Sequence, residues 1–431
     1  MMRKHSVLTA ATAAVALVNA FGQTSYALDV HSTDYNGSST PGTFSWASAN
    51  IWSDDLVPDS STSVANISTL TTLSTGTGIT LDASRTLAGL GFNNALAQTG
   101  TGQLTITGGT PSTSRFTLLS ESNGVPSDTT SAPAIYVAPS ITAEAIQINV
   151  PITLGNTATA GHTAYIVNDA TSTAKSIVFN NAITQYVDTT DPLNPVSSSW
   201  GVTFTRAAAA NASVYLEMKG SNASNWSGDT VIDTGLRLYN ALLPYGAGKG
   251  DVTITTNGTL RSGWNSGSAV INGLNGAGAI IFASARDFTV GASGSNGAFT
   301  GAISSSGSNQ VNLNKIGTGT QTLSNATSAY RNTTILDGTL SVDSINATGG
   351  TGASSLGRGD ATANSLRIDG GKLQYTGAGN TTDRLMTIGL RGADLGCQRY
   401  RRTCFYQCRL VCYRGHISIH RGKQHDRRSN H

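Results

Sequence analysis

Short runs in which apolar and polar residues alternate recur between Gly, Asn and Asp residues, and this pattern constrains the fold most. Examples are residues 103–107 (Gln-Leu-Thr-Ile-Thr), 146–150 (Ile-Gln-Ile-Asn-Val) and 252–254 (Val-Thr-Ile). Alternation with a period of two places the apolar side chains on one face of a β-strand, and Gly, Asn and Asp favour turns. The sequence therefore predicts a chain of many short strands.

The composition agrees with this prediction. Of the 431 residues, 49 are Gly, 38% are apolar and only 12% are charged. The abundant Ser, Thr and Asn disfavour helices, and the regularly spaced Leu, Ile and Val leave apolar surface to bury, which argues against disorder. The length allows either two or three globular units or one long repetitive β structure.

An internal repeat favours the repetitive structure. Three segments recur in order, 103, 109 and 113 residues later: 228–238 as 333–340, 248–253 as 357–362, and 258–260 as 371–373. A strand–turn–strand unit with one apolar face cannot bury that face alone, so successive units must stack and share a core.

We therefore predict an all-β fold, a right-handed parallel β-helix or a closely related β-solenoid. Rungs of roughly 20 to 25 residues would give about 15 rungs and a rod on the order of 70 Å long. We expect Gly235, Gly338 and Gly371 at corners, because Gly tolerates backbone conformations that a Cβ would prevent.

Four regions differ in character. Residues 1–27 read as a signal peptide, with Arg3 and Lys4 before a mostly apolar run at 7–21 and small residues around Ala27. A retained membrane anchor is the alternative, although the run is short and contains Asn19. We expect an N-terminal β region with a capping start at 28–140, a β-helical repeat body at 141–396 and a basic, Cys-rich tail at 397–431.

The charge is distributed unevenly between these regions. Residues 28–396 carry 16 basic and 23 acidic residues and no Cys, so we expect a body stabilised by burial and backbone pairing without disulfides. Residues 397–431 carry 9 basic residues, one acidic residue and all four Cys. An acidic body gives no reason to expect a nucleic-acid partner. After the signal peptide, we expect no transmembrane segment.

One stretch is similar to a known family. Residues 299–304 (Phe-Thr-Gly-Ala-Ile-Ser), 313–324 (Leu-Asn-Lys-Ile-Gly-Thr-Gly-Thr-Gln-Thr-Leu-Ser) and 338–340 (Gly-Thr-Leu) together resemble an autotransporter-associated β-strand repeat. A weaker copy covers 216–238, and 46–59 resembles the amino-terminal start of large exported proteins that carry this repeat. The resemblance covers about half of the chain.

The resemblance implies an extracellular β-helical passenger with a structural or adhesive role, secreted or at the surface of a Gram-negative-type envelope. Such proteins usually end in an outer-membrane translocator barrel or a short Pro-Glu-Pro anchor, and we expect the translocator to be absent from this chain. The expected partners are cell-surface or matrix glycans, or other cell-envelope proteins. We expect no cofactor.

Few residues suggest catalysis. His31 and His162 have no His or Cys at ligand spacing, and Glu121, Glu144 and Glu217 are scattered. A polysaccharide lyase or glycosidase would be the alternative function, and it would need carboxylates close together. Five aspartates could align on adjacent rungs, although we interpret them as turn residues: Asp82, Asp229, Asp233, Asp251 and Asp337. We therefore assign no catalytic, cofactor-binding or metal residues.

Three other motifs have structural interpretations. Residues 246–250 imitate part of a phosphate-binding loop but lack Ser or Thr after Lys249, and 358–360 form an Arg-Gly-Asp tripeptide. Because both fall at the same point of the internal repeat, we interpret both as turns. Trp46 and Trp52 are expected to cap the end of the solenoid, with sugar stacking as the alternative.

The tail has a separate interpretation. On a helix, its thiols and imidazoles at every fourth residue could line one face as zinc ligands: Cys404, Cys408, Cys412, His416 and His420. The composition changes abruptly inside a repeat, however. One permitted codon choice for 396–404, read one base later, encodes Asp-Ala-Ser-Gly-Thr-Gly-Ala-Leu-Ala, which resembles the body. We therefore expect a frameshift near Gly396 and a disordered tail, with zinc binding or a genuine basic tail as alternatives.

Overall fold

The structure is a computed structural model in which nearly every regular element is a β-strand. Two one-turn 3-10 helices, η2 (Ala49–Ile51) and η3 (Ala363–Ser365), are the exceptions among the described residues. The structure describes residues 43–52, 54–67, 78–92, 103–109, 113–120, 133–139, 146–157, 161–170, 176–192, 196–197, 199–206, 214–220, 224–262, 269–305, 311–347, 352–360, 362–379, 382 and 384–396, and the strand backbone at 29–32, 160, 175, 381, 397, 404–405, 409–413 and 416–420.

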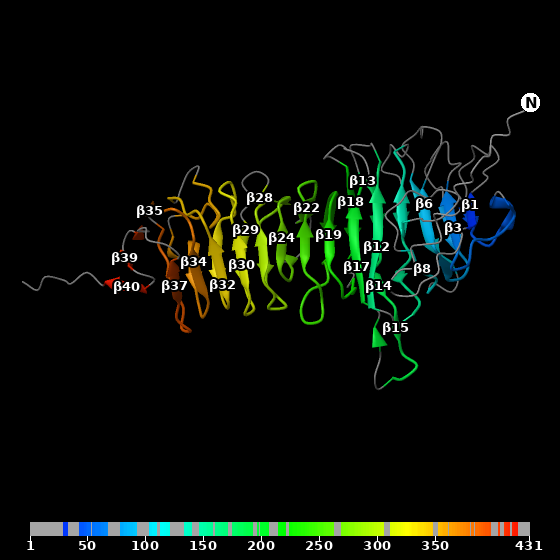
Figure 1. Cartoon of the computed structure of the whole chain (residues 1–431). Coiled ribbons are helices and arrows are strands. Elements are labelled where there is room, and N and C mark those ends of the chain that lie inside the picture. The colour runs from blue at the N-terminus through cyan, green and yellow to red at the C-terminus, as the bar shows by residue number, and fades with distance from the viewer. Residues whose placement is uncertain are drawn as a thin grey trace, which may run out of the picture.

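The strands stack in register along one axis, as Figure 1 shows from the side. We call the 14-stranded sheet the long sheet, and all of its pairs are parallel. Its strands in spatial order are β1 (Asp29–Ser32), β3 (Ser63–Ile67), β6 (Gly89–Phe92), β9 (Ile135–Val137), β12 (Ala160–Asn168), β17 (Ser199–Thr205), β19 (Thr230–Ile232), β21 (Val252–Ile254), β24 (Leu274–Gly276), β27 (Gly297–Phe299), β30 (Thr320–Leu323), β32 (Thr339–Val342), β34 (Lys372–Tyr375) and β37 (Asp394–Cys397).

A second side of the column is a ten-stranded parallel sheet, which we call the second sheet. Its strands in spatial order are β2 (Thr43–Ser45), β4 (Gly78–Leu81), β7 (Leu104–Gly108), β10 (Ile146–Ile148), β13 (Lys175–Phe179), β18 (Tyr215–Lys219), β20 (Gly235–Tyr239), β22 (Thr259–Ser262), β25 (Ala279–Phe282) and β28 (Ala302–Ser305). The chain passes from the long sheet to this sheet in each rung from β3 to β28, so the strands are linked by crossovers and not by hairpins.

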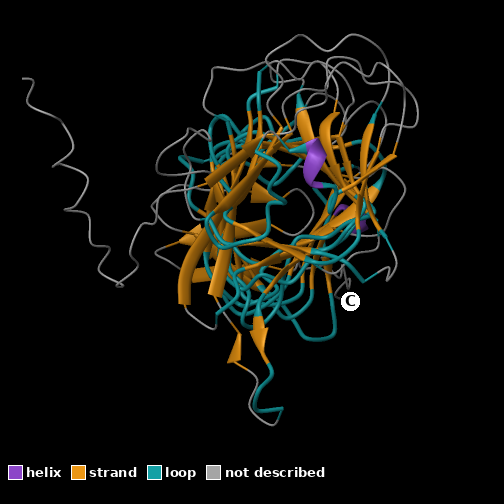
Figure 2. Cartoon of the chain, turned by 90° about the vertical axis from the view of Figure 1, so that its right-hand side faces the viewer, coloured by secondary structure: helices purple, strands orange, loops and turns teal. Residues whose placement is uncertain are grey.

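Two smaller parallel sheets lie on the third side. The N-terminal one contains β5 (Arg85–Leu87), β8 (Phe116–Leu118), β11 (Ile152–Leu154) and β14 (Ile183–Gln185). The C-terminal one contains β23 (Ala269–Val270), β26 (Arg286–Val290), β29 (Val311–Lys315), β31 (Asn332–Ile335), β33 (Leu366–Ile368) and β36 (Thr387–Ile388). Viewed along the axis, the strands surround a common interior (Figure 2).

That interior is one continuous apolar core. Buried apolar residues from Trp46 to Tyr375 form a single cluster. On the second sheet, Leu236, Leu260, Ile280 and Ile303 are register partners in consecutive rungs, and all four are buried. Each such side chain stabilises the fold by about 1.5 to 3 kcal/mol relative to an exposed one. The predicted parallel β-solenoid is confirmed.

The rungs vary in length more than we predicted. Partner positions lie 22 residues apart from Thr230 to Val252 and from Val252 to Leu274, within the expected range. Between Leu90 and Ile135 they lie 45 residues apart. Another insertion forms an antiparallel hairpin, β15 (Val187–Asp188) and β16 (Val196–Ser197), which projects from the column in Figure 1. Insertions therefore leave the stacking intact.

The two copies of the internal repeat lie at different places in the rung. In its first copy, β19 lies on the long sheet and β20 on the second sheet, whereas in its second copy β31 lies on the third side and β32 on the long sheet. The repeated unit is therefore a strand–corner–strand that serves at two different corners. The turn that follows the unit keeps its conformation, because Gly248 and Gly357 both have a φ of +71°, whereas of the equivalent corner glycines Gly235 and Gly338 only Gly338 has a positive φ.

Glycine lies at all three predicted corners for two physical reasons. Gly338, between β31 and β32, has a φ of +58°, which other residues rarely adopt. Gly235 and Gly371 lack a positive φ but pack closely, and a Cβ on them would clash with Val214 O and Ile335 Cγ2, respectively.

Residues 1–27, the predicted signal peptide, lie outside the described part of the chain. In the tail, the described backbone forms strands: β35 (Thr381–Thr382) pairs with β38 (Cys404–Phe405), and β39 (Arg409–Tyr413) is antiparallel to β40 (His416–His420). Four of the five candidate zinc ligands are in these strands, so they do not share a helical face. The frameshift stays a prediction. No helix among the described residues is long and apolar enough to cross a membrane.

Candidate functional site: polar networks and an arginine–tyrosine ladder

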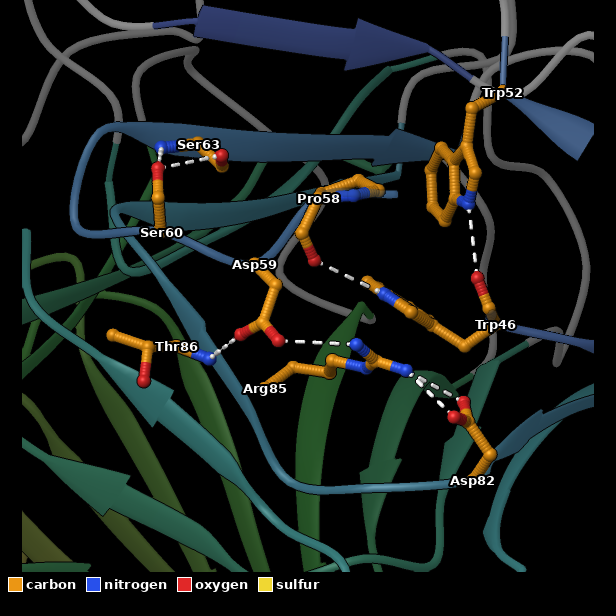
Figure 3. Close-up of polar contacts among 9 residues, drawn as sticks. All are labelled: Trp46, Trp52, Pro58, Asp59, Ser60, Ser63, Asp82, Arg85 and Thr86. Carbon is orange, nitrogen blue, oxygen red and sulfur yellow. Dashed lines mark hydrogen bonds and ion pairs between the residues drawn. The ribbon is translucent and has the colours of Figure 1, made fainter. Parts of the chain in front are cut away.

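The two N-terminal tryptophans are part of the core. Trp46 and Trp52 are 0% and 1% exposed, and their ring centroids lie 4.9 Å apart. Trp46 Nε1 donates to Pro58 O at 3.2 Å, and Trp52 Nε1 donates to Trp46 O at 3.1 Å (Figure 3). Sugar stacking on these rings is wrong because both are buried, while their position among the first rungs agrees with the predicted capping role.

Beside them, Arg85 forms a network with two aspartates (Figure 3). Its Nη1 lies 3.0 Å from Asp59 Oδ2, and its Nη2 lies 2.7 and 2.8 Å from the two oxygens of Asp82. Asp59 Oδ1 also accepts a hydrogen bond from Thr86 N at 2.9 Å. Burial opposes ionisation of Asp82, but the hydrogen bonds and charge of Arg85 hold the pKa of Asp82 below its ordinary value. This network joins the loop before β3 to β5.

Two of the candidate aspartates form a ladder along one corner. Asp229 Oδ1 accepts a hydrogen bond from Asp251 N at 2.9 Å, one rung further on. Asp251 Oδ1 in turn accepts from Gly273 N at 2.9 Å and from Ser295 Oγ at 2.5 Å. The structure thus brings these two carboxylates together, and each satisfies a backbone N–H of the next rung, as expected of turn aspartates.

The remaining aspartates also bind their own corners. Asp233 accepts hydrogen bonds from the hydroxyls of Thr205 and Thr255, and Asp337 Oδ1 accepts from Gly338 N at 2.7 Å. Asp82 belongs to the separate Arg85 network, so the five candidates do not converge on one cleft.

The candidate His and Glu residues are dispersed as well. His162 stacks on Trp200, with ring centroids 5.0 Å apart, and Glu217 forms an ion pair with Arg237 at 3.2 Å. The side chains of His31, Glu121 and Glu144 lie outside the described residues. Within the described ranges, no group of three or more His, Cys, Asp or Glu residues has a geometry that could hold a metal ion.

The two motifs that imitate ligand-binding sequences, residues 246–250 and 358–360, both form turns. Asn272 is fully buried, donates to the carbonyls of Gly246, Lys249 and Gly250, and accepts from Gly246 N at 2.7 Å. In the Arg-Gly-Asp tripeptide, Asp360 Oδ2 lies 2.6 Å from Arg331 Nε. Burial acts to raise the pKa of Asp360, but hydrogen bonds from Thr362 and Arg331 lower it below its ordinary value.

Residues 315–319 (Lys-Ile-Gly-Thr-Gly), which lie in the stretch that resembles an autotransporter-associated repeat, also form a corner. Lys315 is 0% exposed, and its Nζ donates to Ile316 O and Gly317 O at 2.7 Å and to Asp337 O at 3.3 Å. Burial lowers the pKa of Lys315 to about 8, although the charge of Asp337 acts in the opposite direction. The motif therefore uses its lysine to join carbonyls of consecutive rungs.

A cluster on the outer face of the second sheet was not predicted from the sequence. We call it the arginine–tyrosine ladder; its members are Tyr215, Glu217 and Lys219 of β18, Arg237 and Tyr239 of β20, and Arg261 of β22. Glu217, Arg237 and Arg261 are register partners in three consecutive rungs. The signal in the sequence is a charged residue at the centre of each of three short strands, but the unequal spacing of 20 and 24 residues hides the alignment.

Contacts within the ladder fix Arg237. Its Nη1 donates to Tyr215 Oη at 2.9 Å, and its guanidinium carbon lies 5.5 Å from the Tyr215 ring and 5.4 Å from the Tyr239 ring. Lys219 Nζ lies 5.5 Å from the same Tyr239 ring. Cation–π contacts of this kind orient the cations and contribute about 0.5 to 1 kcal/mol each at exposed sites.

Comparison with known proteins gives one partial match. Over 175 residues, or 40% of this chain, the sequence is 32% identical to the adhesin BmaC autotransporter of Brucella suis biovar 1 (strain 1330). The match spans 5% of the length of that adhesin. No protein-family model and no solved structure matches the chain. Together with the stacked parallel strands, this similarity is consistent with an autotransporter passenger-like protein, the family that residues 299–340 resemble.

Proposed function

We propose that this chain is an exported adhesive and structural protein that acts at the cell surface or outside the cell. The observation that carries the proposal is the single apolar core, which extends through consecutive rungs from Trp46 to Tyr375. Such a core makes a stiff column whose sides present polar side chains to solvent. The similarity to an autotransporter adhesin supports the same role and a location at a Gram-negative cell surface.

Adhesion by such a column rests on many weak contacts and not on one deep pocket. Several modest contacts along one molecule raise the overall avidity, provided that the partner can engage them simultaneously. We expect the partners to be cell-surface or matrix glycans or other envelope proteins. Three of the five candidate aspartates, Asp229, Asp251 and Asp337, accept hydrogen bonds from backbone N–H groups at corners, which supports a role without catalysis.

Adhesion and cleavage can be measured on the same material. Beads coated with the full chain should adhere to matrix-coated or cell-coated surfaces more than beads coated with serum albumin. The same protein should release no sugar from a panel of polysaccharides. Adhesion equal to the albumin control would contradict the proposal, and release of sugar would favour a polysaccharide lyase or glycosidase.

A further inference from the structure

We infer that the arginine–tyrosine ladder is a binding site for an acidic polysaccharide, whose carboxylate or sulfate groups it would recognise. The inference rests on the proposed adhesive function and names the class of partner and the face that binds it. The members alternate with the buried core residues Leu216, Leu236 and Leu260, so they occupy the outer face of the second sheet. Lys219 is exposed, and Tyr215, Arg237, Tyr239 and Arg261 are partly exposed.

Charge is the first reason for this inference. Strands β18, β20 and β22 carry three cations, Lys219, Arg237 and Arg261, and a single carboxylate, Glu217. Glu217 is 2% exposed and forms an ion pair with Arg237 at 3.2 Å, so these strands carry three cations for one buried carboxylate. The ladder is therefore a local cationic site on an otherwise acidic body, and it favours an anionic ligand.

Arg261 is the second reason. It is the register partner of Arg237 one rung further on, where neighbouring strands are about 4.8 Å apart, so the two arginines occupy neighbouring positions on the same face. The buried Nε of Arg261 has no hydrogen-bond partner within the part of the chain that the structure describes. Arg261 as a whole is partly exposed, so a carboxylate or sulfate at the surface would reach its guanidinium group and supply a charge-assisted partner there.

The geometry favours a sugar polymer over other polyanions. Arg237 is fixed by Tyr215, Tyr239 and Glu217 before any ligand binds, which lowers the entropic cost of binding. The tyrosine hydroxyls can exchange hydrogen bonds with sugar hydroxyls. Nucleic acids and anionic membranes bind mainly through many cations, whereas strands β18, β20 and β22 together carry three.

The experiment measures binding of the full chain to immobilised polymers. Heparin supplies sulfate groups, polygalacturonate supplies carboxylates, and dextran is neutral. We expect binding to at least one acidic polymer that weakens with salt, and no binding to dextran. The acidic polymer that binds more tightly identifies the anionic group. Binding to phosphatidylserine vesicles in place of both acidic polymers would overturn the inference.

Substitutions locate the site. Arg261→Gln should weaken binding by about tenfold, as expected for the loss of a charge-assisted hydrogen bond. The matched control is Arg367→Gln, which removes the same charge from an exposed arginine on the third side. It should leave the affinity within about twofold of the wild type. Equal losses in the two variants, or no loss in Arg261→Gln, would overturn the inference.

Two further comparisons keep these outcomes interpretable. Arg261→Lys retains the positive charge and should bind more tightly than Arg261→Gln, whereas equal affinities of folded variants would contradict a role for that charge. Circular dichroism checks that each variant retains its β content. If coated beads adhere but Arg261→Gln binds the polymers as the wild type does, the ladder assignment fails and the adhesive function stands. If no beads adhere, the adhesive function fails whatever the polymers show.

Discussion

Individual polar residues in this protein mainly join one rung to the next. Lys315 donates to carbonyls on both sides of a corner, Asn272 closes the turn at 246–250, and Asp251 accepts a backbone N–H from the following rung. Corners interrupt the strand ladders, and buried backbone groups there need other partners. These side chains supply the missing hydrogen bonds, which explains why the polar positions in corner motifs recur.

Lys315 predicts an unusual dependence of stability on pH. Its folded pKa of about 8 is below the value of 10.5 for an unperturbed lysine, so the unfolded chain binds more protons between these values. The free energy of unfolding should therefore rise with pH across this window by up to about 3 kcal/mol. Urea denaturation at several pH values measures this.

The control for that experiment is Lys315→Met, which cannot bind a proton at this position. The stability of the wild type relative to this variant should increase from about pH 8 to about pH 10.5 and remain constant below pH 7. A difference that is the same at every pH would show that Lys315 titrates as it does in the unfolded chain.

The Arg85 network predicts a pH dependence of the same sign at acidic pH, where stability again rises with pH. The pKa of Asp82 is lowered in the folded state, so its ion pair stabilises the protein above the ordinary carboxyl pKa and is lost as the pH falls through the folded pKa. Arg85→Gln should cost about 1 kcal/mol at pH 7, because both aspartates are partly exposed. The cost should shrink toward zero in acid. Thermal melts at pH 7 and pH 2.5 test this, and an unchanged cost would refute it.

For the individual elements, the positions of strands in the sequence were predictable. The side of the column on which each strand lies was not. Alternation and turn residues identified strands such as 146–148 and 252–254, because these signals are local. The side of the column on which a strand lies cannot be read from distance along the chain, because partner positions lie 22 residues apart in one pair of rungs and 45 in another. For the same reason, the sequence did not reveal that Arg237 and Arg261 are neighbours.

The glycines at the turns between strands allow a prediction about stability. Gly338 and Gly392 both have a positive φ, but a Cβ on Gly338 would clash with the carbonyl oxygens of Gly317 and Gly319, whereas one on Gly392 has nothing within 4 Å. Gly392→Ala should cost about 1 kcal/mol from backbone strain alone. Gly338→Ala should cost about 1 to 3 kcal/mol more, because the corner must also shift. Urea unfolding of both variants measures the difference, and equal costs would contradict close packing at this corner.

The whole molecule is organised by stacking, and both its stability and its proposed adhesive role follow from that. The single core was predictable because a one-sided strand unit has no other way to bury its apolar face. The N-terminal tryptophans lie inside this column, and the arginine–tyrosine ladder is on its outer face. Of the five candidate aspartates, Asp229, Asp251 and Asp337 lie at its corners and satisfy backbone N–H groups there, which is the role that turn chemistry predicted.

Small-angle X-ray scattering of the full chain tests the stacked column most directly. The 14 strands of the long sheet, about 4.8 Å apart, make a column about 60 Å long. The distribution of interatomic distances should peak at the width of one rung and decline slowly to that length or beyond. A symmetric distribution, as a sphere gives, or two separate peaks from independent globules, would contradict a single column.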